Sequence, residues 1–153
     1  MSPGFVMSLS IYALKLLALA ETIHRWLAML MGLDRANRER IADFAEAIAA
    51  TLARAVQAMM RLEAVPGDAI TRNEALRELG RMTGYVETIV AVLEQHLDGR
   101  KIAGVKRRLD QLDVERLALA LAIEVQSAPR GASIEQLSTA EGYFRALADG
   151  LRA

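Results

Sequence analysis

The sequence predicts an all-α protein, built as an antiparallel up-down four-helix bundle with an additional fifth helix at its C-terminus. Apolar side chains recur every three or four residues in five segments, which is the spacing of one helix face. Hydrophobic residues make up 53% of the 153 residues but aromatic residues only 5%. The surplus is largely alanine, the strongest helix former. No run of alternating β-branched residues indicates a strand. The length suits a single helical-bundle domain, 1–153.

The first expected helix covers residues 8–31 and carries a heptad seam. Its apolar positions repeat at alternating spacings of three and four, which is the a/d pattern of a bundle or coiled coil. Those positions are Leu9, Tyr12, Leu16, Leu19, Ile23, Trp26 and Leu30. Gly32 ends the helix, and Asp34 is a suitable N-cap for the next one.

The second expected helix covers residues 35–63, and its alanines thin one side for close packing. The sequence Pro66-Gly67-Asp68 then marks a loop. Thr71 and Glu74 have capping-box spacing, so they are expected to open the third helix, which runs to residue 97.

The fourth expected helix covers residues 100–126. Its second half is apolar on all sides, which favours a central position or an oligomer interface. Pro129, Arg130 and Gly131 form the last loop. A second capping box, Ser133 with Gln136, opens a fifth helix that runs to residue 151. The short loops predict that consecutive helices are antiparallel neighbours.

The charge and cysteine content exclude several classes of function. Lys and Arg together number 19, as do Asp and Glu. Zero net charge argues against a protein that coats DNA or an anionic membrane, and it makes self-association easier. The absence of cysteine excludes disulfides, thiolate metal sites and thiol nucleophiles, and it fits the cytoplasm. Charged residues interrupt the apolar N-terminal stretch, so we expect no signal peptide and no membrane partner.

The sequence contains no convincing catalytic or metal site, so we expect no enzyme and no cofactor. Glu21 and His24 form one Glu-x-x-His unit, but a ferritin-like di-metal site needs two such units. The other histidine, His96, has Leu93 where the glutamate would stand. Neither histidine lies near a glycine-flanked serine, and no phosphate-binding glycine loop appears. A ferritin-like metal-dependent enzyme is therefore a distant third interpretation.

A basic segment opens the fourth expected helix. It contains five cationic residues within nine positions and no acid: Arg100, Lys101, Lys106, Arg107 and Arg108. Cations beside a helix N-terminus predict binding of a phosphate ligand or a nucleic acid. Alternatively, Lys106 or Arg107 pairs with Asp110 within the helix. No aromatic residue is interleaved for base stacking, so nucleic-acid binding is the less favoured hypothesis.

Three glycines interrupt the expected helices: Gly80, Gly84 and Gly104. Each costs roughly 0.5–1 kcal/mol relative to alanine. We expect a tight helix crossing to offset that cost. The alternative is a groove that admits a ligand or the backbone of a partner.

Apolar residues near the N-terminus exceed what one seam needs. They predict a surface for a partner helix at Phe5, Trp26, Met29 and Met31. Alternatively, they seal one end of the bundle. The leading hypothesis is a non-enzymatic helical interaction module, which forms a homo-oligomer or docks a protein partner.

Overall fold

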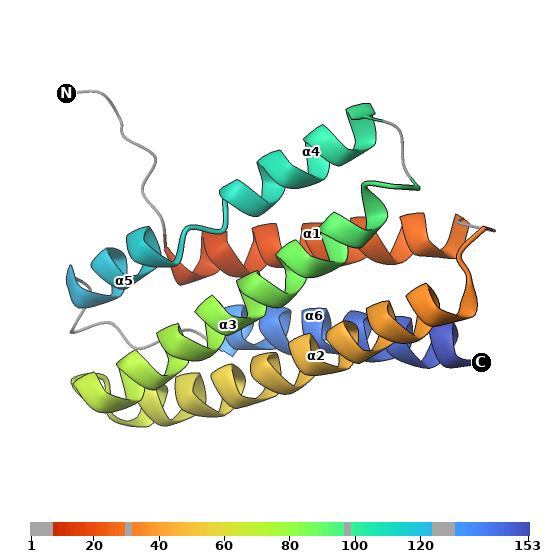
Figure 1. The fold of residues 1–153 in the computed structure, drawn as a ribbon. Coiled ribbons are helices and arrows are strands. Elements are labelled where there is room, and N and C mark those ends of the chain that lie inside the picture. The colour runs from red at the N-terminus through yellow and green to blue at the C-terminus, as the bar shows by residue number, and fades with distance from the viewer. Residues whose placement is uncertain (1–7, 30–31, 97–98, 124–130) are drawn as a thin grey trace.

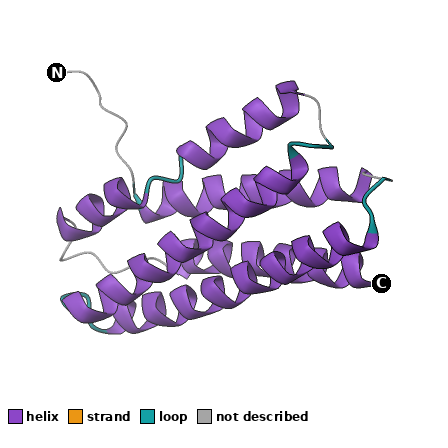
Figure 2. Cartoon of the chain, in the orientation of Figure 1, coloured by secondary structure: helices purple, strands orange, loops and turns teal. Residues whose placement is uncertain are grey.

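The computed structural model describes residues 8–29, 32–96, 99–123 and 131–153. In these ranges the chain forms six helices and no strand (Figure 1). The helices are α1 (Leu9–Met29), α2 (Arg35–Ala64), α3 (Ala69–Leu93), α4 (Gly99–Asp110), α5 (Val114–Ile123) and α6 (Gly131–Arg152). The predicted all-α bundle is confirmed. Figure 2 shows that short loops connect consecutive helices wherever the connection is described.

The helices form a closed ring around the core. α1 packs on α6, α6 on α2, and α2 on α3, while α4 and α5 bridge α3 and α1. Neighbours around the ring are antiparallel, except that α1 and α6 run in the same direction (Figure 1). Because α4 and α5 share one position, the ring has five positions. A ring with an odd number of positions must contain one parallel pair.

The C-terminal helix does not lie outside a bundle formed by the others. α6 packs between α1 and α2, and the described backbones of α1 and α2 do not approach each other. The expectation that every pair of consecutive helices would be neighbours is therefore wrong for this pair. The physical reason is that α6 buries small residues, including Ala140 and Ala148, beside the large Phe144. It can therefore pack closely against helices on two sides.

The expected fourth helix is two helices, because the chain breaks between α4 and α5. The Asp113 carboxylate accepts backbone hydrogen bonds from Glu115 at 3.0 Å and Arg116 at 3.2 Å. This is the N-cap of a new helix. Leu112, just before the cap, is buried, so the break directs an apolar side chain into the core.

The capping boxes also differ from expectation. The N-cap of α3 is Asp68, whose carboxylate accepts hydrogen bonds from the backbone of Ile70 and Thr71 and from the Thr71 hydroxyl. α3 therefore begins before Thr71. Ser133 is likewise inside the first turn of α6 and is buried. An acidic residue upstream displaced the predicted cap at α3.

The core consists of the apolar stripes of all the ring positions. The seam of α1 is buried as predicted from Leu9 to Ile23, and α2 contributes a largely alanine face. The fully buried alanines of α2 are Ala42, Ala45, Ala49 and Ala55. Small side chains let α3 and α6 pack on two sides of α2. Among the described residues, no helix combines the length and the apolar character that crossing a membrane requires.

Candidate interaction surfaces

The Glu21–His24 unit lies between α1 and α6. The Tyr143 hydroxyl donates a hydrogen bond of 3.5 Å to Glu21 Oε1. The His24 ring meets the edge of the Tyr143 ring, with centroids 5.7 Å apart. Within the described ranges, no group of three or more His, Asp or Glu side chains is placed to hold a metal ion. The contacts of this unit join one helix to its neighbour.

Two residues of the basic segment hold α4 in the fold. Lys106 forms an ion pair with Glu94 of α3. Arg108 Nη1 donates a hydrogen bond of 2.6 Å to Thr22 Oγ1 of α1. The predicted pairing of Lys106 with Asp110 does not occur, because Lys106 reaches across to the neighbouring helix instead. These two cations therefore fasten opposite flanks of α4.

The other three cations of the segment, Arg100, Lys101 and Arg107, are exposed on α4. Because Lys106 and Arg108 point to opposite flanks, the five basic side chains do not converge on one site. Binding of an anion by this segment stays a prediction.

The prediction of a tight crossing at the helix glycines is wrong. A Cβ atom added at Gly80, Gly84 or Gly104 would meet no described atom within 4 Å, apart from the atoms of its own helical surroundings. Gly80 and Gly84 lie on the exposed side of α3, away from its buried stripe. Their cost in helix stability is therefore not offset by close packing against any part of the chain that the structure describes. The open strip fits the alternative of a groove.

Of the four residues predicted to form a partner surface near the N-terminus, only Trp26 has a side chain that the structure describes. Trp26 is half-buried and packs against the core, which fits the alternative that it seals the bundle. Phe5 and Met31 lie outside the described residues, as does the side chain of Met29. The prediction is not tested at those three positions.

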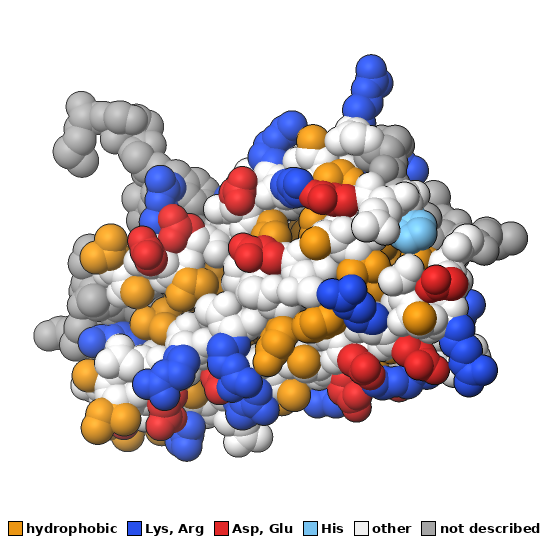
Figure 3. Space-filling view, in the orientation of Figure 1, with side chains coloured by type: hydrophobic (Ala, Val, Ile, Leu, Met, Phe, Trp, Pro, Cys, Tyr) orange, Lys and Arg blue, Asp and Glu red, His pale blue; other side chains and the backbone are white. Residues whose placement is uncertain are grey.

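An exposed apolar surface lies where α2 meets α3, and the sequence reasoning missed it. We define the α2–α3 turn surface as Met60, Val65 and Ile70, whose exposed fractions are 57%, 58% and 74%. Figure 3 shows hydrophobic side chains gathered at this end of the molecule. The available signal was a Pro-Gly loop flanked by apolar residues that the helix stripes do not need.

The rim of this surface is charged. Arg61 of α2 pairs with Glu74 of α3 at 3.1 Å. Farther from the turn on the same two helices, Arg54 pairs with Glu78 at 3.0 Å. An apolar centre with a polar rim is typical of protein interfaces.

A charged groove runs between α3 and α4. It has a volume of about 310 Å³, with Val90 and Leu109 in its floor. Glu87, Glu94, Lys106 and Asp110 line it, and the charged and apolar side chains between these helices are visible in Figure 3. Lys106 and Glu94 neutralise each other. Glu87 and Asp110 form no ion pair with any described residue.

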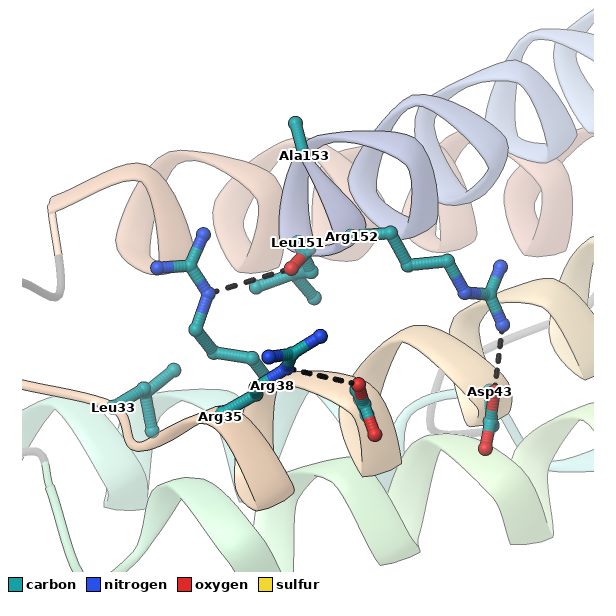
Figure 4. Close-up of a pocket in the computed structure, with 8 residues that line it drawn as sticks. Leu33, Arg35, Arg38, Asp43, Leu151, Arg152 and Ala153 are labelled. Atoms are coloured by element: carbon teal, nitrogen blue, oxygen red, sulfur yellow. Dashed lines mark hydrogen bonds and ion pairs between the residues drawn. The ribbon is translucent and has the colours of Figure 1, made fainter.

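A cavity of about 690 Å³ lies between the start of α2 and the end of α6 (Figure 4). Three arginines line it, and each already has an acceptor. Arg35 pairs with Glu39 at 3.4 Å, Arg38 Nε donates 3.3 Å to the Leu151 carbonyl, and Arg152 contacts Asp43 at 2.6 Å. The carboxylates of Asp43 and Glu46 accept hydrogen bonds from Arg152, and these bonds raise the pKa of the arginine. The bonds of Arg38 and Arg152 tie α6 to α2, whereas the Arg35–Glu39 pair lies within α2. An anion would have to displace all of them.

A polar group without a partner lies in the core. Tyr12 of α1 is fully buried, and its hydroxyl has no hydrogen-bond partner among the described atoms. Burial raises the pKa of this hydroxyl, and the nearby Thr83 hydroxyl of α3 opposes that rise only in part. No hydrogen bond joins the two hydroxyls, and the Thr83 hydroxyl directs its proton to the Leu79 carbonyl at 3.0 Å instead.

In comparisons with known proteins, no family model, curated protein or solved structure matches this chain.

Proposed function

We propose that this chain is a non-enzymatic helical interaction module that docks a protein partner through the α2–α3 turn surface. The observation that supports it is the exposure of Met60, Val65 and Ile70, each more than half exposed and all at one helix–turn–helix segment. The other exposed large hydrophobic residues of the described part of the chain, Leu14 and Leu119, lie apart from them on α1 and α5. Single exposed apolar residues are ordinary on protein surfaces, but a group of them at one turn is not.

Much of the apolar surface of these three side chains is still in contact with water. Side chains of this size gain about 1.5–3 kcal/mol each when they are fully buried. A partner that covers all three would therefore gain several kcal/mol before it forms any polar contact. The Arg61–Glu74 pair at the rim contributes little affinity but selects orientation, as rim charges do.

The chemistry of the surface indicates its partner. A helix or loop that places two or three apolar side chains at its centre would fit. The absence of cysteine is the reason to place this module in the cytoplasm.

Site-specific photo-crosslinking tests the proposal. A benzoylphenylalanine in place of Ile70 is expected to give one discrete adduct in cells, while the same probe at Ala146, an exposed position on α6, gives none. Adding Val65→Asp to the Ile70 probe should abolish the adduct, and circular dichroism should show that the helices persist. Equal labelling at Ala146, or no adduct at Ile70, would overturn the proposal.

Nucleic-acid binding by the basic segment is the weaker alternative, because Glu94 and Thr22 already engage Lys106 and Arg108. Salt-dependent binding of a short RNA, lost on charge reversal of Arg100 and Arg107, would favour that alternative instead.

A further inference from the structure

The charged groove between α3 and α4 has unmet negative charge. Of its three carboxylates, only Glu94 has a counter-ion in the part of the chain that the structure describes, and that counter-ion is Lys106. Glu87 and Asp110 are left beside an apolar floor of Val90 and Leu109. A carboxylate beside low-dielectric surface attracts a cation more strongly than one surrounded by water. The groove is therefore complementary to a positively charged, close-fitting surface.

The same molecule carries such a surface on the outer side of α4. Ile102, Val105 and Leu109 face the core, and Lys106 and Arg108 reach to the flanks. Helix geometry then places Ala103 and Arg107, four residues apart, on the side facing away from the core. Both are exposed, and Arg107 forms no ion pair with a described residue.

The surroundings of the groove allow a second helix to approach. Ala91 and Gly84 are exposed on α3, and the space beside Gly84 is open. Ala103 on the outer side of α4 is also small, so at these three positions the helix backbones of two copies can approach each other closely. Zero net charge removes the long-range repulsion between copies.

We propose that two copies of this chain pair about a two-fold axis, with the outer side of α4 in each copy lying against the charged groove of the other. Arg107 of each copy then faces Glu87 of its partner. In a two-fold interface every contact is made twice, so each copy must carry both of the surfaces that meet. This chain does so, because the charged groove and the basic outer side of α4 lie on the same pair of helices. Because a second copy would form the Arg107–Glu87 contact twice, it is favoured as the partner over an unrelated basic protein.

This inference goes beyond the docking proposed for the α2–α3 turn surface. Ile70 lies in the first turn of α3, whereas Glu87 and Glu94 lie at its other end. A dimer formed at the groove leaves the turn surface free, so each proposal can fail without the other.

A charge swap followed by sedimentation velocity tests the dimer. The wild-type chain is expected to sediment as a dimer, and Glu87→Arg or Arg107→Glu alone should raise the dimer dissociation constant at least ~10-fold by placing like charges opposite each other. The double variant should restore the dimer to within ~3-fold of wild type, because each new pair has opposite signs again. A rise in salt from 0.05 to 0.5 M should weaken the wild-type dimer.

Matched controls separate the interface from general effects of charge. Glu63→Arg and Arg77→Glu change the charge by the same amounts at exposed positions outside the groove, and they should leave the dimer unchanged. The milder pair Glu87→Gln and Arg107→Gln, checked for helicity, replaces any reversal that unfolds the chain. A wild-type monomer at millimolar concentration, a dimer insensitive to both reversals, or a double variant that stays monomeric would each overturn the proposal.

Discussion

Arg108 of α4 donates a hydrogen bond of 2.6 Å to the hydroxyl of Thr22 on α1. The same hydroxyl donates 2.8 Å to the Ala18 carbonyl one turn earlier. Thr22 is buried, so on folding its hydroxyl oxygen loses its hydrogen bonds to water and accepts one from the Arg108 guanidinium instead. One polar contact thus joins two helices that are 86 positions apart at these residues.

Removal of this contact should destabilise the fold. A hydrogen bond to a charged group contributes about 1.5–3 kcal/mol. Arg108→Ala should lower the free energy of unfolding by roughly 1.5–2 kcal/mol, the lower part of that range, because the arginine is exposed. Urea denaturation measures the change, and Arg107→Ala should cost less than about 0.5 kcal/mol. A double-mutant cycle with Thr22→Val would show no coupling if the bond were absent in solution.

Replacement of the exposed helix glycine Gly80 should stabilise the protein. An added Cβ meets no described atom within 4 Å, and alanine is favoured over glycine in a helix by about 0.5–1 kcal/mol. Thermal unfolding of Gly80→Ala should therefore show a higher Tm. A lower Tm would mean that a close helix contact exists at this position after all. Gly67, in the loop after α2, serves as a comparison because no helix propensity applies there.

Replacement of the unpaired core tyrosine should also stabilise the fold. Tyr12→Phe removes a buried hydroxyl that lacks a partner, and a group of that kind costs about 1–3 kcal/mol. We expect a gain of roughly 1 kcal/mol in chemical denaturation, because the ring still fills the same space. Tyr143→Phe, which removes the hydroxyl bonded to Glu21, should give no gain. Destabilisation by Tyr12→Phe would mean that Thr83 does accept a hydrogen bond from it.

The cap of α3 should make stability depend on pH in the acid range. Hydrogen bonds from the Thr71 hydroxyl and backbone hold the pKa of Asp68 below its ordinary value of 3.8. A carboxylate with a lowered pKa stabilises the fold above its unfolded pKa, and that contribution is lost as the pH falls through the folded pKa. Urea midpoints at pH 7 and pH 3 should therefore differ more for wild type than for Asp68→Asn. Equal differences in the two proteins would contradict the cap.

The sequence predicted the helices well because their burial repeats with the helix period. The seam from Leu9 to Ile23 is buried throughout, as a strict three-and-four spacing requires. The break at Asp113 was missed because neither glycine nor proline marks it. An aspartate with free backbone amides after it caps a helix equally well.

Pairings between helices could not be read from the sequence in the same way. Lys106 has an acid four positions along its own helix, and yet it binds Glu94 on α3. Local spacing identifies candidate partners within one helix, but the choice between them depends on which helix packs alongside. The position of α6 could not be predicted for the same reason, because the apolar stripe of a helix does not identify the helices that it contacts.

The placement of α6 has a consequence for synthesis on the ribosome. α2 has α3 as an early partner, but its other buried side and the matching side of α1 are both covered by α6, which is made last. Until α6 emerges, the alanine face of α2 and part of the heptad seam of α1 remain in water. Tyr143 and Glu21, which meet in the finished fold, are separated by 122 positions, so closing the ring has a substantial entropic cost. The nascent chain therefore has a prolonged window in which a chaperone can bind it.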